Sequence, residues 1–134
     1  MTITGEPRRI VSPDGLRAGH NASGADIAKN LFVRIVPAGT DNPTQISLPL
    51  AGGPVFGGTM QIIKNGQNGD VQTDQRATIV AGAGGVTVGM KLAATVAGAA
   101  VAAVSGDNIV GTAVTAAAAT EIAEVELKDE GAMP

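Results

Sequence analysis

The side chains that could perform chemistry are few, and their spacing suits none of the common catalytic arrangements. The single histidine, His20, lies in a stretch broken by Pro and Gly, with Ser12 and Ser23 as its neighbouring serines. A Ser-His-Asp triad needs the histidine beside a positioned serine, and catalysis needs fixed geometry. We therefore interpret His20 as a surface or contact residue and predict that the chain is not an enzyme. An unfamiliar enzyme or small-ligand binder stays open as an alternative.

Carboxylates and glycines raise two further possibilities, a metal site and a phosphate-binding loop. Asp70, Asp74 and Asp107 occur in turn-rich stretches without the spaced acids and closing Glu of an EF-hand loop. Aspartates in turns usually accept hydrogen bonds from nearby backbone. Gly84–Gly89 and Gly52–Gly57 have the glycine spacing of a phosphate-binding loop, but neither is followed by Gly-Lys-Ser/Thr. We predict no metal and no cofactor.

The composition of the chain argues against several classes of partner. Its 134 residues include two Phe but no Trp, Tyr or Cys. Single-strand nucleic-acid binders stack bases on aromatic rings, and Arg8-Arg9 alone is too small a patch for a duplex. The N-terminal sequence lacks the apolar core of a signal peptide, and no run of about 18 apolar residues occurs. We expect no nucleic-acid or membrane partner, and the absence of Cys fits synthesis in a reducing cytoplasm.

The apolar residues predict a lean hydrophobic core. Apolar residues make up 44% of the chain, but they are mostly Ala, Val and Ile, and Gly occurs 19 times, which is about twice its average usage. Small side chains bury little area each, and ordering Gly costs extra backbone entropy. We therefore expect contacts with other chains to supply part of the stability. Residues 1–34 carry five basic and three acidic side chains, and residues 120–134 carry one basic and five acidic, so the basic leader could contact an acidic neighbour or simply be solvated.

Short strands are the elements that would have to position these side chains. Residues 1–26 show no sustained period, so we predict an extended N-terminal arm over residues 1–30 and a β-rich body over residues 31–134. Ser23 could cap a short helix over Asp26–Lys29. Strands are predicted at 31–36, 45–50, 59–64, 71–73, 77–81, 86–91, 99–104, 109–114 and 123–127. Asn65-Gly66 is a hairpin signal. The spacing predicts an all-β fold, a small β-barrel or sandwich of short antiparallel strands with the extended arm.

The C-terminal half resembles the decoration, or cement, proteins of tailed-phage capsids. The resemblance rests on Val86-Thr87-Val88-Gly89-Met90-Lys91-Leu92, the Ala-rich stretch 93–104, the stretch from Gly106 to Ala113, and the acidic-apolar stretch from Glu121 to Leu127. It covers less than half of the chain and does not include residues 31–66, whose role stays open.

The resemblance implies a virion protein on the outer capsid surface. Such a protein would bridge neighbouring major capsid proteins, stabilise the shell and cluster with copies of itself, as a homotrimer. An extended terminus would contact the capsid, and deleting residues 1–26 would abolish binding. The candidate capsid contacts are Ile3, Arg8, Arg9, Ile10, Val11 and Leu16. Another virion component, such as a tail or fibre protein, is the alternative.

Overall fold

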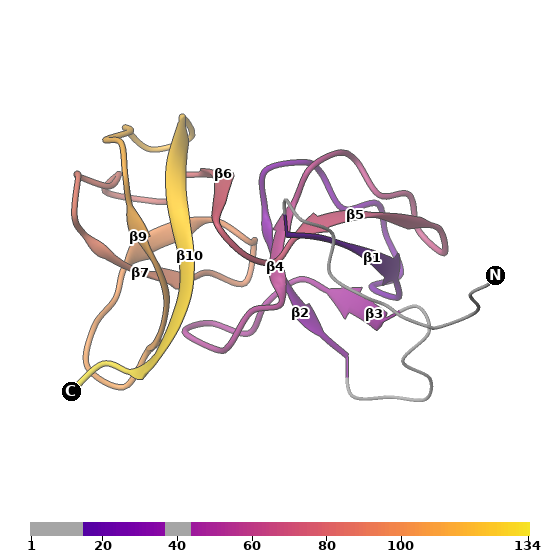
Figure 1. The fold of residues 1–134 in the computed structure, drawn as a ribbon, viewed down its shortest axis with the longest axis horizontal. Helices are drawn as coiled ribbons and strands as arrows, with labels where there is room; N and C mark the ends of the chain where they lie inside the picture. Colours follow the sequence, from indigo (N-terminus) through magenta and orange to yellow (C-terminus); the bar gives the residue numbers. More distant parts are fainter. Residues whose placement is uncertain (1–14, 37–43) are drawn as a thin grey trace, which may run out of the picture.

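The computed structural model describes residues 15–36 and 44–134, which form ten strands and no helix within those ranges. The strands divide into two lobes that lie side by side (Figure 1). The barrel lobe contains β1 (Leu16–Asn21), β2 (Phe32–Ile35), β3 (Thr44–Ser47), β4 (Gly57–Thr59) and β5 (Asn68–Gln72). The second lobe contains β6 (Arg76–Val80), β7 (Lys91–Ala94), β8 (Ala100–Ala102), β9 (Asn108–Ala113) and β10 (Ile122–Ala132). The all-β prediction is confirmed.

The barrel closes in the order β1-β3-β2-β4-β5, with β5 pairing back to β1. Its pairs are antiparallel except for β1 and β3, which run parallel. The interior is filled by aliphatic side chains that are almost fully buried. These are Ile27, Val33, Ile46, Ile63 and Val71. Five aliphatic side chains suffice because a barrel of five very short strands encloses a small volume.

The barrel corrects the predicted arm. β1 lies within the predicted arm of residues 1–30 and pairs with both β3 and β5, so residues 16–21 form a barrel strand and not part of an extended arm. Residues 1–14 of the predicted arm lie outside the described residues. Ile27 is also a core residue, held by a backbone pair of hydrogen bonds with Ile63. The predicted helix over Asp26–Lys29 does not form. The alternation of apolar and polar residues that predicts a strand is obscured in β1, because the small residues Ala18 and Gly19 stand at its centre.

The second lobe is a five-stranded sheet in the order β6-β10-β9-β7-β8. Its two outer strands meet, because Ala81 at the end of β6 forms a bridge with Ala100 of β8 and the Gly82 amide donates to the Ala100 carbonyl over 2.8 Å. β10 shows the predicted alternation, with Val125 and its period-2 neighbours buried and Glu126 exposed. The strand is longer than predicted and contains a register shift between Leu127 and Gly131.

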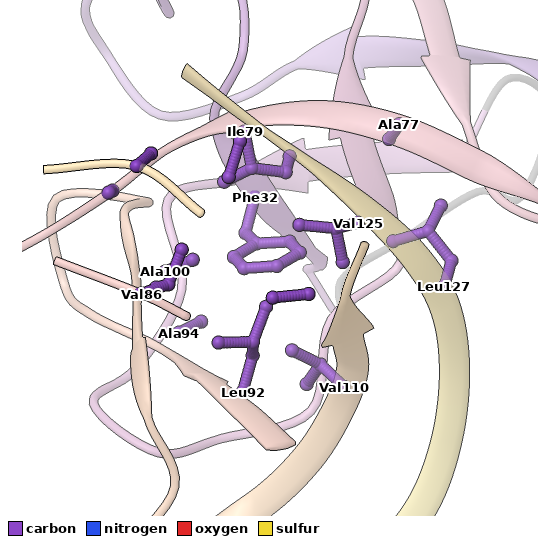
Figure 2. Packing of buried hydrophobic residues seen from close by; sticks show 14 residues of the cluster. Phe32, Ala77, Ile79, Val86, Leu92, Ala94, Ala100, Val110, Val125 and Leu127 are labelled. Atoms are coloured by element: carbon purple, nitrogen blue, oxygen red, sulfur yellow. The ribbon is translucent and has the colours of Figure 1, made fainter. Parts of the chain in front are cut away.

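Phe32 joins the two lobes. It belongs to β2 of the barrel, yet its fully buried side chain packs with the core of the second lobe. Figure 2 shows its ring pointing toward Leu92 and Val125, with Ile79 beside it. The Phe32 amide also donates to the carbonyl of Gly98, over 2.8 Å. An aromatic ring is the largest apolar unit in this chain, so its placement makes the two cores energetically dependent on one another.

Glycine permits the close approach of the lobes. Gly58 in β4 lies so near β6 that a Cβ there would stand 2.6 Å from Cδ1 of Ile79. A side chain at this position would therefore push the barrel away from the second lobe. The high glycine content is used here to bring two small cores together.

Candidate docking surfaces

Most of the predicted capsid contacts fall outside the described part of the chain. Ile3, Arg8, Arg9, Ile10 and Val11 all lie in residues 1–14, about which the structure gives no information. Leu16 is the exception. It is half-buried at the start of β1, opposite Gln72 of β5, and is therefore a barrel residue at the strand's first position.

The side chains that could take part in catalysis or metal binding do not form a reactive site in the described ranges. His20 Nδ1 lies 2.7 Å from Oδ1 of Asn68, and this contact is exposed. Asp74 accepts a hydrogen bond from the Gln75 amide over 2.8 Å, and Asp107 accepts one from the Val104 amide over 3.0 Å. These two aspartates thus bond local backbone, as the turn interpretation predicts.

Metal-binding clusters, membrane-spanning helices and phosphate-binding loops are also absent from the described residues. Across residues 15–36 and 44–134, no group of three or more His, Asp or Glu side chains is placed to hold a metal ion. Within these residues there is also no helix that could cross a membrane. Gly84–Gly89 contains three residues with positive φ and leads into β7, while Gly52–Gly57 leads into β4. A phosphate-binding loop is followed by a helix, so neither segment has the required context.

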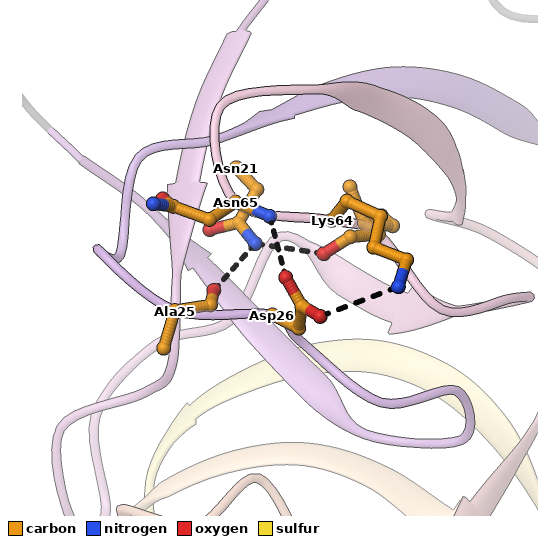
Figure 3. Close-up of polar contacts among 6 residues, drawn as sticks. Asn21, Ala25, Asp26, Lys64 and Asn65 are labelled. Carbon is orange, nitrogen blue, oxygen red and sulfur yellow. Dashed lines mark hydrogen bonds and ion pairs between the residues drawn. The ribbon is translucent and has the colours of Figure 1, made fainter.

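A buried amide organises the end of the barrel (Figure 3). Asn21 is 1% exposed, and its Nδ2 donates to the carbonyls of Ala25 and Ile63 over 2.7 and 2.8 Å. Its Oδ1 accepts from the amide and the hydroxyl of Ser23 over 2.9 and 2.7 Å. Ser23 therefore stabilises a turn and does not cap a helix. The buried Asn21 side chain thus donates two hydrogen bonds and accepts two, so its hydrogen-bonding capacity is used within the fold and its role is structural.

An ion pair continues this network at the surface. Asp26 accepts a hydrogen bond from the Asn65 amide over 2.9 Å, and its other oxygen lies 3.6 Å from Lys64 Nζ. Both charged side chains are more than half exposed, so solvent screening leaves the ion pair little weight. The Asn65-Gly66 turn forms as predicted, with Gly66 at φ 77°.

A cleft of about 310 Å³ lies where the two lobes meet. Its apolar lining comes from both lobes and includes Val55, Phe56, Val110 and Leu127. Its polar lining includes Thr73, Asp74, Asn108, Lys128 and Asp129. Asp129 accepts hydrogen bonds from Asn108 Nδ2 over 3.1 Å and from the Gly131 amide over 2.9 Å, which fixes its position. The cleft thus has an apolar floor and a polar rim that carries two acidic side chains, Asp74 and Asp129, and one basic side chain, Lys128.

A second hollow, which we call the apolar groove, lies on the barrel lobe. It has a volume of about 250 Å³ and is lined by Arg34, Ile35, Leu50, Pro54 and Val55. Ile35 is 50% exposed and Leu50 is 60% exposed. The Arg34 Nε donates to the carbonyl of Leu48 over 3.0 Å, so its guanidinium is tied to the groove wall. Large apolar side chains that remain exposed together are typical of surfaces that contact another molecule.

Comparison with known proteins identifies the fold. No protein-family model matches the chain, and no curated protein matches it. A solved structure does match, the N base of the head fiber gp8.5 of bacteriophage phi29, with a TM-score of 0.69 and 14% sequence identity. The match covers 89% of this chain and 97% of the other chain. The two-lobed arrangement is therefore shared as a fold over nearly the whole of both molecules.

Proposed function

We propose that the chain is a non-catalytic structural component of a phage virion. The observation that carries the proposal is the fold that it shares, over nearly its full length, with the base of a phage head fiber. In the described residues, polar side chains such as Asn21 and Asp74 form hydrogen bonds with the backbone, which supports a structural role. Fold similarity alone is an argument by analogy, so the position on the particle must be tested directly.

On this proposal the protein sits on the outer surface of the head as a decoration protein. It binds the major capsid protein, bridges neighbouring copies of it and stabilises the shell, and it associates with copies of itself as a homotrimer. Neither nucleic acid nor membrane takes part. The second candidate is a fibre component anchored to the particle, which the fiber base of phi29 specifically favours.

The apolar groove is the described surface best suited to contact a capsid subunit. Burying the exposed halves of Ile35 and Leu50 contributes about 1 kcal/mol each. Such a contribution is modest for one copy, but it is repeated wherever a copy binds on a symmetric lattice. The arm residues Arg8, Arg9 and Ile10 would add to the same attachment.

Cryo-electron microscopy of virions that carry the chain tests the position. Density of this two-lobed shape on the outside of the head supports the decoration proposal, and density only at the foot of a fibre supports the second candidate. Particles that lack the protein altogether would overturn both. The mass of the purified protein in solution tests the homotrimer.

Variant binding tests the surface. Leu50→Asp should weaken binding to phage heads at least tenfold, because a charge replaces an apolar contact. Val88→Asp is the matched control, since Val88 is 69% exposed and belongs to the second lobe. Equal binding by the two variants would exclude the apolar groove as the contact surface.

The deletion that tests the predicted arm has to end before β1, which begins at Leu16. Removing residues 1–26 would also remove β1, which pairs with two barrel strands, and would unfold the lobe. Removing residues 1–14 leaves the described strands intact and isolates the contribution of the arm.

A further inference from the structure

The inter-lobe cleft lies where the N-terminal segment enters the fold. β1 runs antiparallel to β5, with Leu16 opposite Gln72. One residue earlier, the Gly15 carbonyl accepts hydrogen bonds from the amide and the hydroxyl of Thr73 over 2.8 and 3.0 Å. Thr73 and the next residue, Asp74, line the cleft. Gly15 is therefore hydrogen-bonded to a residue that stands at the rim of the cleft.

The chemistry of the cleft matches the sequence that precedes Gly15. We propose that residues 8–11, Arg8-Arg9-Ile10-Val11, bind in the inter-lobe cleft of their own chain. Ile10 and Val11 supply the apolar side chains for the floor, and Arg8 and Arg9 supply positive charge for the two carboxylates of the rim, Asp74 and Asp129.

The reach of the chain allows this placement. Val11 precedes Gly15 by four residues, which span at most about 14 Å when extended, and Arg8 precedes it by seven, which span at most about 25 Å. A volume of about 310 Å³ corresponds to roughly ten water molecules at about 30 Å³ each. This is enough room for branched aliphatic side chains, and Asp74 and Asp129 are exposed at the rim to meet the arginines.

The occupant is argued to be this chain because attachment favours it. A segment tethered at the rim has a high effective concentration there, whereas a free partner must also lose translational freedom. The binding is nevertheless reversible, since ordering the segment costs entropy that opposes the contacts. The same residues would then be covered in the free protein and released when a capsid contact replaces the cleft. The proposal itself concerns the isolated chain and does not depend on the proposed function.

Trypsin cleavage after Arg8 and Arg9 in the full chain tests the proposal. Asp74→Asn with Asp129→Asn removes both rim charges but keeps oxygen acceptors for the Gln75 and Gly131 amides. We expect cleavage roughly fivefold faster in this double variant, from the loss of two exposed ion pairs. The matched control is Asp26→Asn, which removes an exposed charge from the barrel turn at Lys64 and should leave the rate unchanged. Equal rates in the double variant and the native chain would overturn the proposal.

Amide chemical shifts provide a second readout that does not depend on charge. Ile10→Ser with Val11→Ser should shift the backbone amides of Asn108, Leu127 and Lys128, whereas the control Ile3→Ser should not. Unchanged shifts at these amides would contradict the proposal. Both measurements are repeated over a range of protein concentrations. Protection that rises with concentration would overturn binding in the same chain, because it would show that a second copy supplies the segment.

Discussion

Truncating Phe32 should destabilise the whole molecule, not the barrel alone. The ring is fully buried among second-lobe residues, including Leu92 and Val125. Phe→Ala in such a site costs about 4 kcal/mol, because transfer free energy is lost and a cavity remains. Since single domains are stable by about 5–15 kcal/mol, this change removes a large part of the total.

Urea denaturation followed by circular dichroism measures the loss. With a denaturant slope of about 2 kcal/mol per molar urea, Phe32→Ala should lower the midpoint by about 2 M. NMR amide signals from Ile46 in the barrel and Leu92 in the second lobe should disappear together, because one side chain contributes to both units. Intrinsic fluorescence is a poor probe, since the chain contains neither Trp nor Tyr.

Phe56→Ala is the matched control for this prediction. Phe56 is only partly buried against the barrel core, so its truncation should cost about half as much. The reasoning is refuted if Phe32→Ala costs less than about 1 kcal/mol, or if the barrel signals vanish while the second-lobe signals remain in place.

Two further predictions concern backbone geometry and buried polarity. Gly98→Ala should lower the free energy of unfolding by about 2 kcal/mol more than Gly106→Ala, as measured by thermal unfolding. Both residues have positive φ, 85° at Gly98 and 92° at Gly106. Of the two, only Gly98 lies against another chain segment, because a Cβ there would stand 2.8 Å from Leu31 Cβ. Equal losses would show that strain alone decides. Asn21→Ala should cost about 2 kcal/mol, since it removes a buried amide that makes four hydrogen bonds. Asn68→Ala, at an exposed position, should cost less than about 0.5 kcal/mol.

The sequence predicted those strands best in which large and polar residues alternate. β6 and β10 lie close to their predicted ranges, because Ile79 and Val125 are buried between neighbours that are less buried. β1 was missed because Ala18 and Gly19 carry no clear period. The predicted strand over 59–64 is mostly absent. Only β4 and the single bridge at Ile63 form there, because the segment turns around the barrel end.

The candidate surfaces were harder to predict than the strands. The apolar groove combines Ile35 from β2 with Leu50 and Pro54 from the loop before β4, and no local pattern brings these positions together. The sequence carries one signal for this surface. Ile35 is strongly apolar, and Pro37 two residues later marks the end of its strand. The inter-lobe cleft could not be predicted from the sequence, because the arrangement of the two lobes depends on the long-range packing of Phe32 in the core of the second lobe.

The way in which both lobes close has a consequence for solubility. Over the described ranges, β1 has a hydrogen-bonded neighbour on each side, and the bridge between Ala81 and Ala100 brings the outer strands of the second sheet together. Unpaired strand edges are the usual templates for aggregation. Neighbouring copies of the protein would therefore meet through side chains, without merging backbones into a continuous fibril.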